Sequence, residues 1–222
     1  MSSVGTLAGT TNYLQNKEID WELRAQVFTP PTTVYVALFI ASKGSIQRST
    51  AYTSGDTASF IAADGNNHLY KCTTSGTTAA SAPAYPGVLG EAITDGGVCV
   101  FTEQTPALQA GTAQVEPTGI GSYARVAITS GLTEWAGTQG AGTTAVSSGT
   151  SATTSNNAAV SFTSPTAPWT TGLQQIWGFG TYDALTAGNP LRFGGLTANQ
   201  NVNTGNTVSF AISALTISND QV

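Results

Sequence analysis

Short runs rich in β-branched and aromatic residues recur along this 222-residue chain, and glycine, proline and asparagine interrupt them. Such runs are typical of strands, and the residues between them are those that favour tight turns. Two clear turn signals are the segments 187–190 and 203–206, which read Ala-Gly-Asn-Pro and Asn-Thr-Gly-Asn. The strand candidates are 33–41, 123–129, 158–162, 174–182, 191–196 and 207–217. Several short strands with this punctuation predict an all-β fold whose main domain is a β-sandwich or jelly roll.

One segment, 12–25, instead predicts a short helix before the first long strand. Asn12 is a candidate N-cap, and Gln15 follows three residues later, as in a capping box. The segment also carries five charged residues, which are Lys17, Glu18, Asp20, Glu22 and Arg24.

The apolar residues of this helix fall on two stripes. Leu14, Trp21 and Ala25 share one stripe, so we expect the helix to pack on the main domain with Trp21 buried. Ile19 and Leu23 lie on the other stripe, which leaves open a helix wedged between the sheet and a neighbouring subunit. Leu14 and Trp21 are therefore also candidate interface residues.

The middle of the chain has a different pattern and predicts a small β subdomain inserted between two strands of the main domain. Asp-Gly pairs at 64–65 and 95–96 are strong hairpin signals. Tyr70, Tyr85 and Phe101 supply the aromatic weight that a small core needs. The predicted boundaries are 1–46 with 107–222 for the main domain and 47–106 for the inserted module.

The segment 137–157 consists almost entirely of glycine, alanine, serine, threonine and asparagine, with Val146 as its larger apolar residue. Such a composition buries too little apolar surface to order a segment by itself. We expect a loop that becomes ordered against a partner, and Val146 is a candidate interface residue.

Charge excludes several classes of partner. Only 9% of the residues are charged, and the net charge of −5 comes without any cluster of lysine or arginine, so we expect no nucleic-acid binding. No apolar run reaches the length of a membrane span, and no secretory signal begins the sequence, so we expect no membrane partner and synthesis in a cytoplasm.

The sequence offers few groups for catalysis or metal binding. His68 is the single histidine, and Cys72 and Cys99 are the two cysteines. Their spacing does not predict a metal site, and we expect two buried thiols, with a disulfide formed after release as the alternative. One histidine leaves most acid–base schemes without their usual proton carrier, so we predict no catalytic residue and no cofactor. Two carboxylates suffice for a glycosidase, which keeps a polysaccharide-degrading enzyme as a remote alternative.

Carbohydrate binding is the stronger alternative to a purely structural role. Aromatic rings beside asparagine, glutamine and aspartate are typical of sugar-binding surfaces, and the same rings are equally typical of cores and interfaces. The tryptophans with polar neighbours are Trp135, Trp169 and Trp177. The candidate host-contact residues of the inserted module are Tyr52, Tyr70 and Tyr85.

Several weak motifs follow one another in a characteristic order. The segment 28–39 has a Thr-Pro-Pro strand entry, and the later motifs are 119–126 (Gly-Ile-Gly-Ser-Tyr-Ala-Arg-Val), 154–162, Trp169, 180–184, 188–196 and 202–210. In this order they resemble a family of small all-β virion proteins of tailed bacteriophages, often labelled tail fibre, minor tail or virion structural protein. The resemblance covers 12–46 and 107–218, and the inserted module resembles a small β-module that recurs in phage structural proteins.

The resemblance implies a non-enzymatic virion protein that acts through protein–protein contacts. We expect a capsid decoration or cement protein on the particle surface, because the chain has no heptads, collagen-like triplets or shaft repeats. The alternative is a tail-tip or tail-fibre component that contacts a host surface glycan. The expected partners are major capsid or tail proteins and further copies of the chain.

Overall fold

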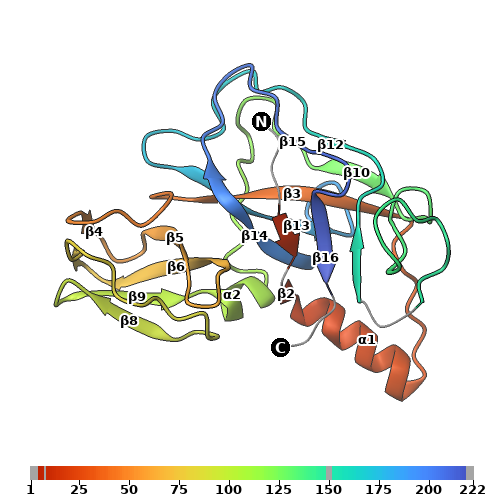
Figure 1. Cartoon of the computed structure of the whole chain (residues 1–222), viewed down its shortest axis with the longest axis horizontal. Coiled ribbons are helices and arrows are strands. Elements are labelled where there is room, and N and C mark those ends of the chain that lie inside the picture. Colours follow the sequence, from red (N-terminus) through yellow and green to blue (C-terminus); the bar gives the residue numbers. More distant parts are fainter. Residues whose placement is uncertain (1–4, 8, 149–151, 219–222) are drawn as a thin grey trace.

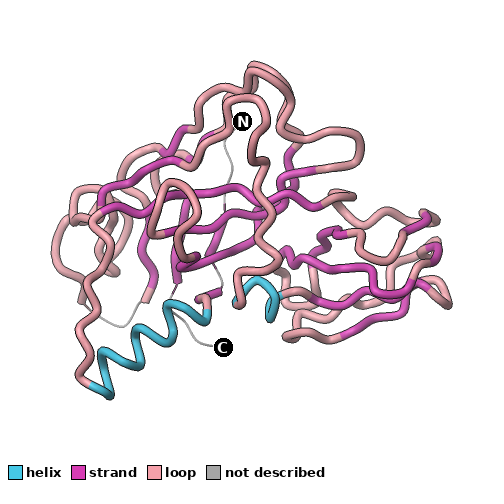
Figure 2. Tube along the Cα trace, turned by 180° about the vertical axis from the view of Figure 1, so that it is seen from behind, coloured by secondary structure: helices cyan, strands magenta, loops and turns pink. Residues whose placement is uncertain are grey.

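The computed structural model describes residues 5–7, 9–148 and 152–218, and the fold is all-β, as predicted (Figure 1). The helices of these ranges are two short ones, α1 (Asn12–Arg24) and α2 (Thr105–Gln109). Neither of them is long and apolar enough to cross a membrane. Figure 2 shows that strands and loops make up the rest of the described chain.

A large mixed sheet forms the centre of the main domain. Its strands are β10 (Val126–Thr129), β3 (Thr33–Ala41), β13 (Gln175–Tyr182), β14 (Pro190–Gln200), β1 (Gly5–Leu7), β16 (Leu215–Ser218) and β11 (Thr153–Ser155), in that spatial order, with β2 (Gly9–Thr10) also beside β14. Neighbours are antiparallel except β1 and β16, which are parallel. The first long predicted strand, 33–41, has the predicted bounds.

Strand β3 is buried on both faces, which explains its continuous apolar run. Side chains alternate between the faces of a strand. Val36 and Leu38 therefore point into one core cluster, and Ala37 and Phe39 point into a second cluster on the opposite face. A strand in the middle of a sheet that is covered on both sides has no solvated face, so its sequence does not alternate with polar residues.

The first cluster is closed by a two-stranded ribbon and by loops. The ribbon pairs β12 (Val160–Ser161) with β15 (Ser209–Phe210). Trp169 is fully buried there, and its indole nitrogen donates a hydrogen bond to the carbonyl oxygen of Gly121 over 2.9 Å. This contact joins two of the motifs that carried the sequence resemblance.

Three predicted strands are shorter or broken. The segment 123–129 becomes extended only at Val126, because Tyr123 turns inward and its hydroxyl bonds to Glu116 and to the backbone amide of Leu38. The segment 158–162 shortens to β12, and 207–217 splits into β15 and β16 around a turn at 211–214.

The inserted segment forms its own sheet beside the main one (Figure 1). Its strands are β5 (Thr57–Ile61), β6 (Asn67–Thr74), β9 (Cys99–Glu103) and β8 (Ala92–Asp95), in that order, with a ribbon of β4 (Ala51–Tyr52) and β7 (Gly76–Thr77). A separate core cluster lies within it, centred on Tyr70, Tyr85 and Phe101. We keep 47–106 as the predicted boundary of this module; its independent folding stays a prediction.

Helix α1 begins at a different cap from the one predicted. Thr11 is the N-cap, and its hydroxyl oxygen accepts a hydrogen bond from the backbone amide of Leu14. Asn12 is instead the first helical residue, because Thr11 is anchored by its hydroxyl to the carbonyl oxygens at the start of β14. The last helical residue is Arg24, and the C-cap Ala25 adopts a left-handed conformation with φ of 53°.

The segment 137–157 is partly built into the main domain. Strand β11 pairs with β16, and Asn156 beside it is buried with its side chain bonded to the backbone of Ala211 and Leu215. The expectation of a segment with no order of its own is therefore wrong at this end. Residues 149–151 of the segment lie outside the described residues.

Candidate functional site

The module meets the main sheet where β6 crosses β14. Gly195 of β14 faces the backbone of Asn67, and a Cβ at that position would stand 2.2 Å from the Asn67 carbonyl oxygen. The side-chain amide nitrogen of Asn67 donates hydrogen bonds to the carbonyl oxygen of Leu196 and to the side-chain oxygen of Asn199, each over 3.0 Å. A glycine on one strand and an amide on the other thus allow two sheets to touch through their backbones.

A polar network extends this contact. The amide nitrogen of Asn199 lies within hydrogen-bond distance of the hydroxyls of Ser45 and Ser59 and of the side-chain oxygen of Gln175. The Gln175 oxygen also accepts from the backbone amide of Ser45 over 3.0 Å. Polar side chains from the module and from the main domain therefore supply hydrogen-bond donors and acceptors to one another at the junction.

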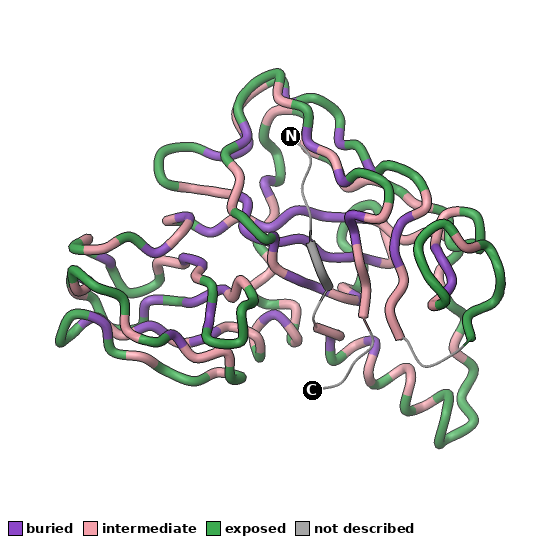
Figure 3. Tube along the Cα trace, in the orientation of Figure 1, coloured by how far each residue is buried: buried purple, intermediate pink, exposed green. Residues whose placement is uncertain are grey.

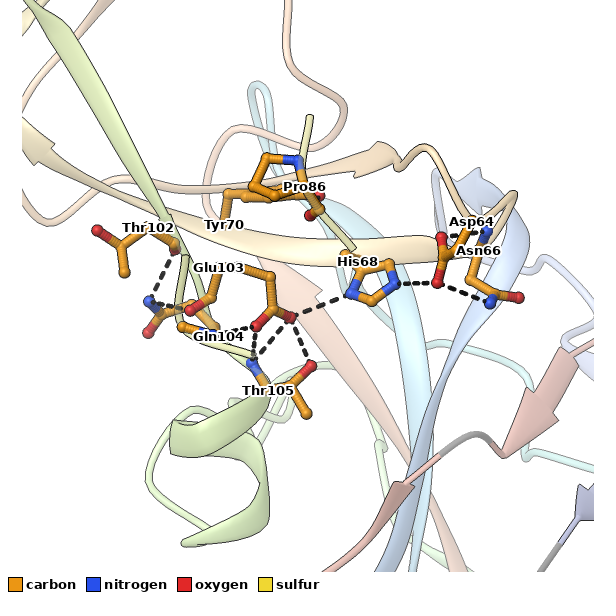
Figure 4. A network of polar contacts seen from close by, with 10 residues as sticks. Asp64, Asn66, His68, Tyr70, Pro86, Thr102, Glu103, Gln104 and Thr105 are labelled. Atoms are coloured by element: carbon orange, nitrogen blue, oxygen red, sulfur yellow. Dashed lines mark hydrogen bonds and ion pairs between the residues drawn. The ribbon is translucent and has the colours of Figure 1, made fainter. Parts of the chain in front are cut away.

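His68 lies at the edge of the junction between two carboxylates (Figure 4). Its Nδ1 is 3.1 Å from Glu103 Oε1, and its Nε2 is 2.9 Å from Asp64 Oδ2. Glu103 also accepts hydrogen bonds from the backbone amides of Gly90 and Thr105. Because each imidazole nitrogen faces a carboxylate, the arrangement favours the doubly protonated ring.

The pKa values of the three groups follow from this geometry. Burial disfavours the imidazolium, but the hydrogen bonds to Glu103 and Asp64 outweigh it and raise the pKa of His68. Burial likewise works against the Glu103 carboxylate, yet its hydrogen bonds from His68, Thr105 and Gly90 lower its pKa. The hydrogen bonds from Asn66 and His68 lower the pKa of Asp64 against the same opposing effect of burial. The cluster is thus held as two carboxylates and one imidazolium.

A cavity of about 150 Å³ opens beside this cluster at the junction. Its apolar lining comes from both the module and the main sheet, and polar side chains from the module stand at its edge. The lining residues are Ile61, Gly65, Asn66, Asn67, His68, Leu69, Thr105, Leu108, Trp177, Phe193, Gly194, Gly195, Leu196 and Thr197. Pockets at the boundary of two packed units, apolar with a few polar groups, are where small ligands usually bind.

The second candidate surface is the outer side of α1. Trp21 is 63% exposed, so the expectation that it is buried against the main domain is wrong. The helix contacts β14 through its first half, where Leu14 is buried and Glu18 lies 3.6 Å from Arg192, and its last turns extend away from the sheets (Figure 3). Ile19, Leu23 and Val27 are exposed on the same extension.

Leu14 and Val146 are the other two predicted interface residues, and one of them is buried while the other is exposed. Leu14 is 8% exposed and belongs to the contact between α1 and the main domain, so it is not available to a partner. Val146 is exposed in the loop that follows Gly137, where the side chain of Gln139 holds its carbonyl oxygen.

The predicted host-contact tyrosines are core residues. Tyr52, Tyr70 and Tyr85 are all buried in the cluster inside the module, so their rings have no face to offer a glycan. The Tyr85 hydroxyl donates to the buried Asp95 over 2.6 Å, which explains how a polar ring tip is accommodated there. Trp169 and Trp177 are buried as well, and Trp135 is partly buried.

The cysteines are free and fully buried in the module. Among the described residues, no group of three or more His, Cys, Asp and Glu side chains is arranged to hold a metal ion. The His68 cluster is consistent with that finding, because its two carboxylates lie on opposite sides of the ring and do not converge on one point (Figure 4).

From the sequence, His68 stood out only as the single histidine, and its two carboxylate partners were not predicted. Asp64 and His68 are four residues apart across an Asp-Gly turn, a spacing that a hairpin brings together. Glu103 reaches the ring from β9, which pairs with β6 by a long-range register. The contact between Asp64 and His68 could have been predicted from their spacing in the sequence. The contact between Glu103 and His68 could not, because it depends on which strands are neighbours in the sheet.

Comparison with known proteins agrees with the fold and with the sequence resemblance. The family model of the podophage GP4 fiber I protein gp80 matches the chain over residues 9–105 and 96–218. A search of curated proteins gave no match. The two matched segments overlap, cover most of the chain and run through the inserted module, which the sequence resemblance to the virion family had left out. The chain therefore belongs to the podophage GP4 fiber I protein gp80 family, a family of bacteriophage fibre proteins.

Proposed function

We propose that this phage structural protein is a non-enzymatic component of a tail fibre that works through protein–protein contacts. The observation that carries the proposal is the match to a fibre family over most of the chain. The same match favours a fibre over the capsid decoration that the sequence suggested, because the family takes its description from fibres. The expected partners are other virion proteins and further copies of this chain.

The outer side of α1 is the surface that we assign to contact with a second copy of the chain. Trp21, Leu23 and Val27 expose apolar surface on an element that extends from the body of the molecule. The helix carries both signs of charge: Arg24 pairs with Asp20 over 2.7 Å and Glu18 lies 3.6 Å from Arg192, while Lys17 and Glu22 add one charge of each sign. Two such helices therefore meet with apolar residues at the centre and complementary charges around them, as homomeric interfaces do.

The position in the particle is tested by labelling. An antibody against the chain, applied to intact particles in negative-stain electron microscopy, should label the fibres. Label over the head would instead establish capsid decoration and overturn the proposal.

The role of α1 is tested on purified protein. We expect the wild-type chain to self-associate in light scattering coupled to size-exclusion chromatography, and the double variant Trp21→Ser, Leu23→Ser to elute as a monomer. Val98→Ser is the matched control, because Val98 is as exposed as Trp21 but lies on the module. A monomeric wild type, or a double variant that associates as the wild type does, contradicts the assignment.

A further inference from the structure

The sheet of the module has an open edge at β8. This strand is the last of the sheet, and β9 is the neighbour with which it pairs (Figure 1). The backbone amide of Glu103 donates to the carbonyl oxygen of Glu91 over 2.9 Å, so every second residue from Glu91 on directs its backbone groups toward β9. The N–H and C=O groups of Ala92 and Thr94 therefore point away from the sheet, and the described part of the chain supplies them with no partner.

The other outer edges of the two large sheets have cover. At the far edge of the module, backbone amides of the segment 43–46 donate to the carbonyl oxygens of Thr57 and Ser59 on β5. In the main sheet, the amide of Ala136 donates to the carbonyl oxygen of Ser155 on β11 over 2.9 Å, and β10 lies against β12 of the ribbon. An uncovered edge such as that of β8 is a template for one more strand.

The residues along this edge suit a second copy of the same strand. Ala92, Ile93 and Thr94 are uncharged, and neither lysine nor proline interrupts them. Val88 and Val98 are both exposed, and they stand five residues before and five residues after Ile93. An antiparallel copy centred on Ile93 therefore brings Val88 of each chain toward Val98 of the other.

The acidic residues beside the strand do not prevent this pairing. Asp95 is buried inside the module and bonded to Arg48 over 2.6 Å, so its charge is compensated and does not lie at the edge. Glu91 is exposed, but the antiparallel arrangement places the two Glu91 residues at opposite ends of the pairing, about 13 Å apart along the strands. Their repulsion is largely screened at physiological salt.

We propose that the edge of β8 pairs with the β8 edge of a second copy of the chain, antiparallel and centred on Ile93. The N–H and C=O groups of Ala92 in each copy bond to those of Thr94 in the other, and the two module sheets become one continuous sheet. The inference rests on the proposed function in taking a further copy as the partner, but its surface is separate from α1. The module and α1 lie at opposite ends of the molecule, so the two contacts together extend the copies into a row (Figure 1).

The β8 contact is small, and its size sets how it must be measured. Each copy contributes a strand of four residues, which buries less than the roughly 1,200 Å² of a standard interface. The contact is therefore populated in solution at high protein concentration, and chromatography of dilute protein reports the α1 contact alone. In a particle, where neighbouring copies are held close together, their high effective concentration favours the same pairing.

Pairing is measured on the full chain carrying Trp21→Ser and Leu23→Ser, so that α1 does not contribute. ¹H–¹⁵N correlation spectra recorded from about 0.05 to about 1 mM, a range suited to a small interface, follow the amide signals of Ala92 and Thr94. We expect both signals to move downfield with concentration and their exchange with deuterium oxide to slow, because both amides become hydrogen-bonded. A mixture of ¹³C-labelled and unlabelled chains should give an isotope-filtered NOE between the Ile93 α-protons, which meet across the antiparallel pair.

Two variants of this chain test the edge. Thr94→Lys should abolish the shifts, because edge lysines oppose the approach of a second strand. Thr73→Lys is the matched control, because Thr73 is an exposed threonine of β6 and β9 separates that strand from the open edge. It should pair as the parent does. Thr94→Pro removes the outward N–H without taking a hydrogen bond from the β9 pairing, and it should weaken pairing at least about tenfold. Spectra at low concentration check that each variant is folded.

The outcomes separate this inference from the α1 assignment. Signals of β8 that stay unchanged over the whole concentration range, shifts that persist in Thr94→Lys, or equal loss in Thr73→Lys each overturn the β8 contact. Any of these results together with a wild type that associates through α1 refutes the β8 contact alone. A wild type that is monomeric in chromatography but shows the β8 shifts at high concentration refutes the α1 assignment and leaves the β8 contact standing.

Discussion

Gly195 of β14 lies directly against the carbonyl oxygen of Asn67 on β6, so the main sheet and the module touch through their backbones. The side chain of Asn67 stabilises the same contact through its hydrogen bonds to Leu196 and Asn199 of β14. The junction cavity depends on this approach, because its lining residues come from both sides of it. The His68 cluster lies at its edge and is built from module residues alone.

A methyl group at Gly195 should therefore force the two strands apart. We expect Gly195→Ala to lower the free energy of unfolding by about 1–3 kcal/mol, the usual cost of overpacking. Chemical denaturation followed by circular dichroism measures the change. Gly131→Ala is the control, since an added Cβ there meets only the flexible carboxylate of Glu134, and its effect should stay within about 0.5 kcal/mol. Equal stability of the two variants would contradict the tight contact.

Two apolar residues of α1 should differ sharply in their effect on stability. Leu14→Ala removes a buried side chain and should cost about 2–3 kcal/mol. Trp21→Ala removes a larger but exposed side chain, and the free energy of unfolding of the monomer should change by less than about 0.5 kcal/mol. Thermal unfolding at low protein concentration compares the two. A larger loss for Trp21→Ala would show that the helix packs differently.

The His68 cluster should make stability depend on pH in both directions. His68 has a raised pKa in the folded protein, so its contribution is complete below the ordinary value of 6.5 and is lost as the pH rises through the folded pKa. Glu103 has a lowered pKa, so its contribution is complete above the ordinary value of 4.5 and is lost as the pH falls through the folded pKa. Stability from the cluster should be greatest between these two values.

The variant His68→Gln isolates the alkaline side of this profile. Glutamine retains hydrogen bonding but does not titrate, so the decline in unfolding free energy above pH 6.5 should flatten. Urea denaturation at a series of pH values checks it. The loss of stability at acid pH is a less specific test, because Asp95 also has a lowered pKa in the folded protein and contributes to the same loss. A variant with an unchanged alkaline decline would remove His68 from the explanation.

The two cysteines should be unreactive in the folded protein. Burial raises the pKa of the Cys72 thiol and raises that of Cys99 to about 12, which suppresses the reactive thiolate. We expect Ellman's reagent to titrate neither thiol in the native protein at pH 8, and both after unfolding in guanidinium chloride. One or two equivalents titrated rapidly in the native state would contradict their burial, and none after unfolding would indicate a disulfide.

Deletion of residues 49–104, with a short Gly-Ser linker, tests whether the module is separable. The main sheet should stay folded, because its central strands β3, β13 and β14 pair with one another without the module. The truncated chain should be less stable than the full one, since Leu69 of the module contributes to the second core cluster. Circular dichroism and limited proteolysis measure the result. An unfolded product would mean that the two sheets form one folding unit.

The sequence by itself determined the all-β class, the presence of the helix, the bounds of the first long strand and the tailed-phage virion family. These features come from local signals: runs of β-branched residues, turn chemistry and the order of motifs. The Asp-Gly turns and the aromatic residues of the middle segment lie in a separate four-stranded sheet, and the boundary of an inserted module stays a prediction.

Only the tertiary structure decided which residues are buried and which meet. Trp21 shares a helical stripe with Leu14, but the second half of the helix extends away from the sheet, so Leu14 is buried and Trp21 is exposed to solvent. Tyr70 and Tyr85 are of a residue type that is common on binding surfaces, but the structure buries both in the core of the module. The pairing of Glu103 with His68, and of Gly195 with Asn67, depends on strand order and on the approach of two sheets, which are long-range properties that no local pattern encodes.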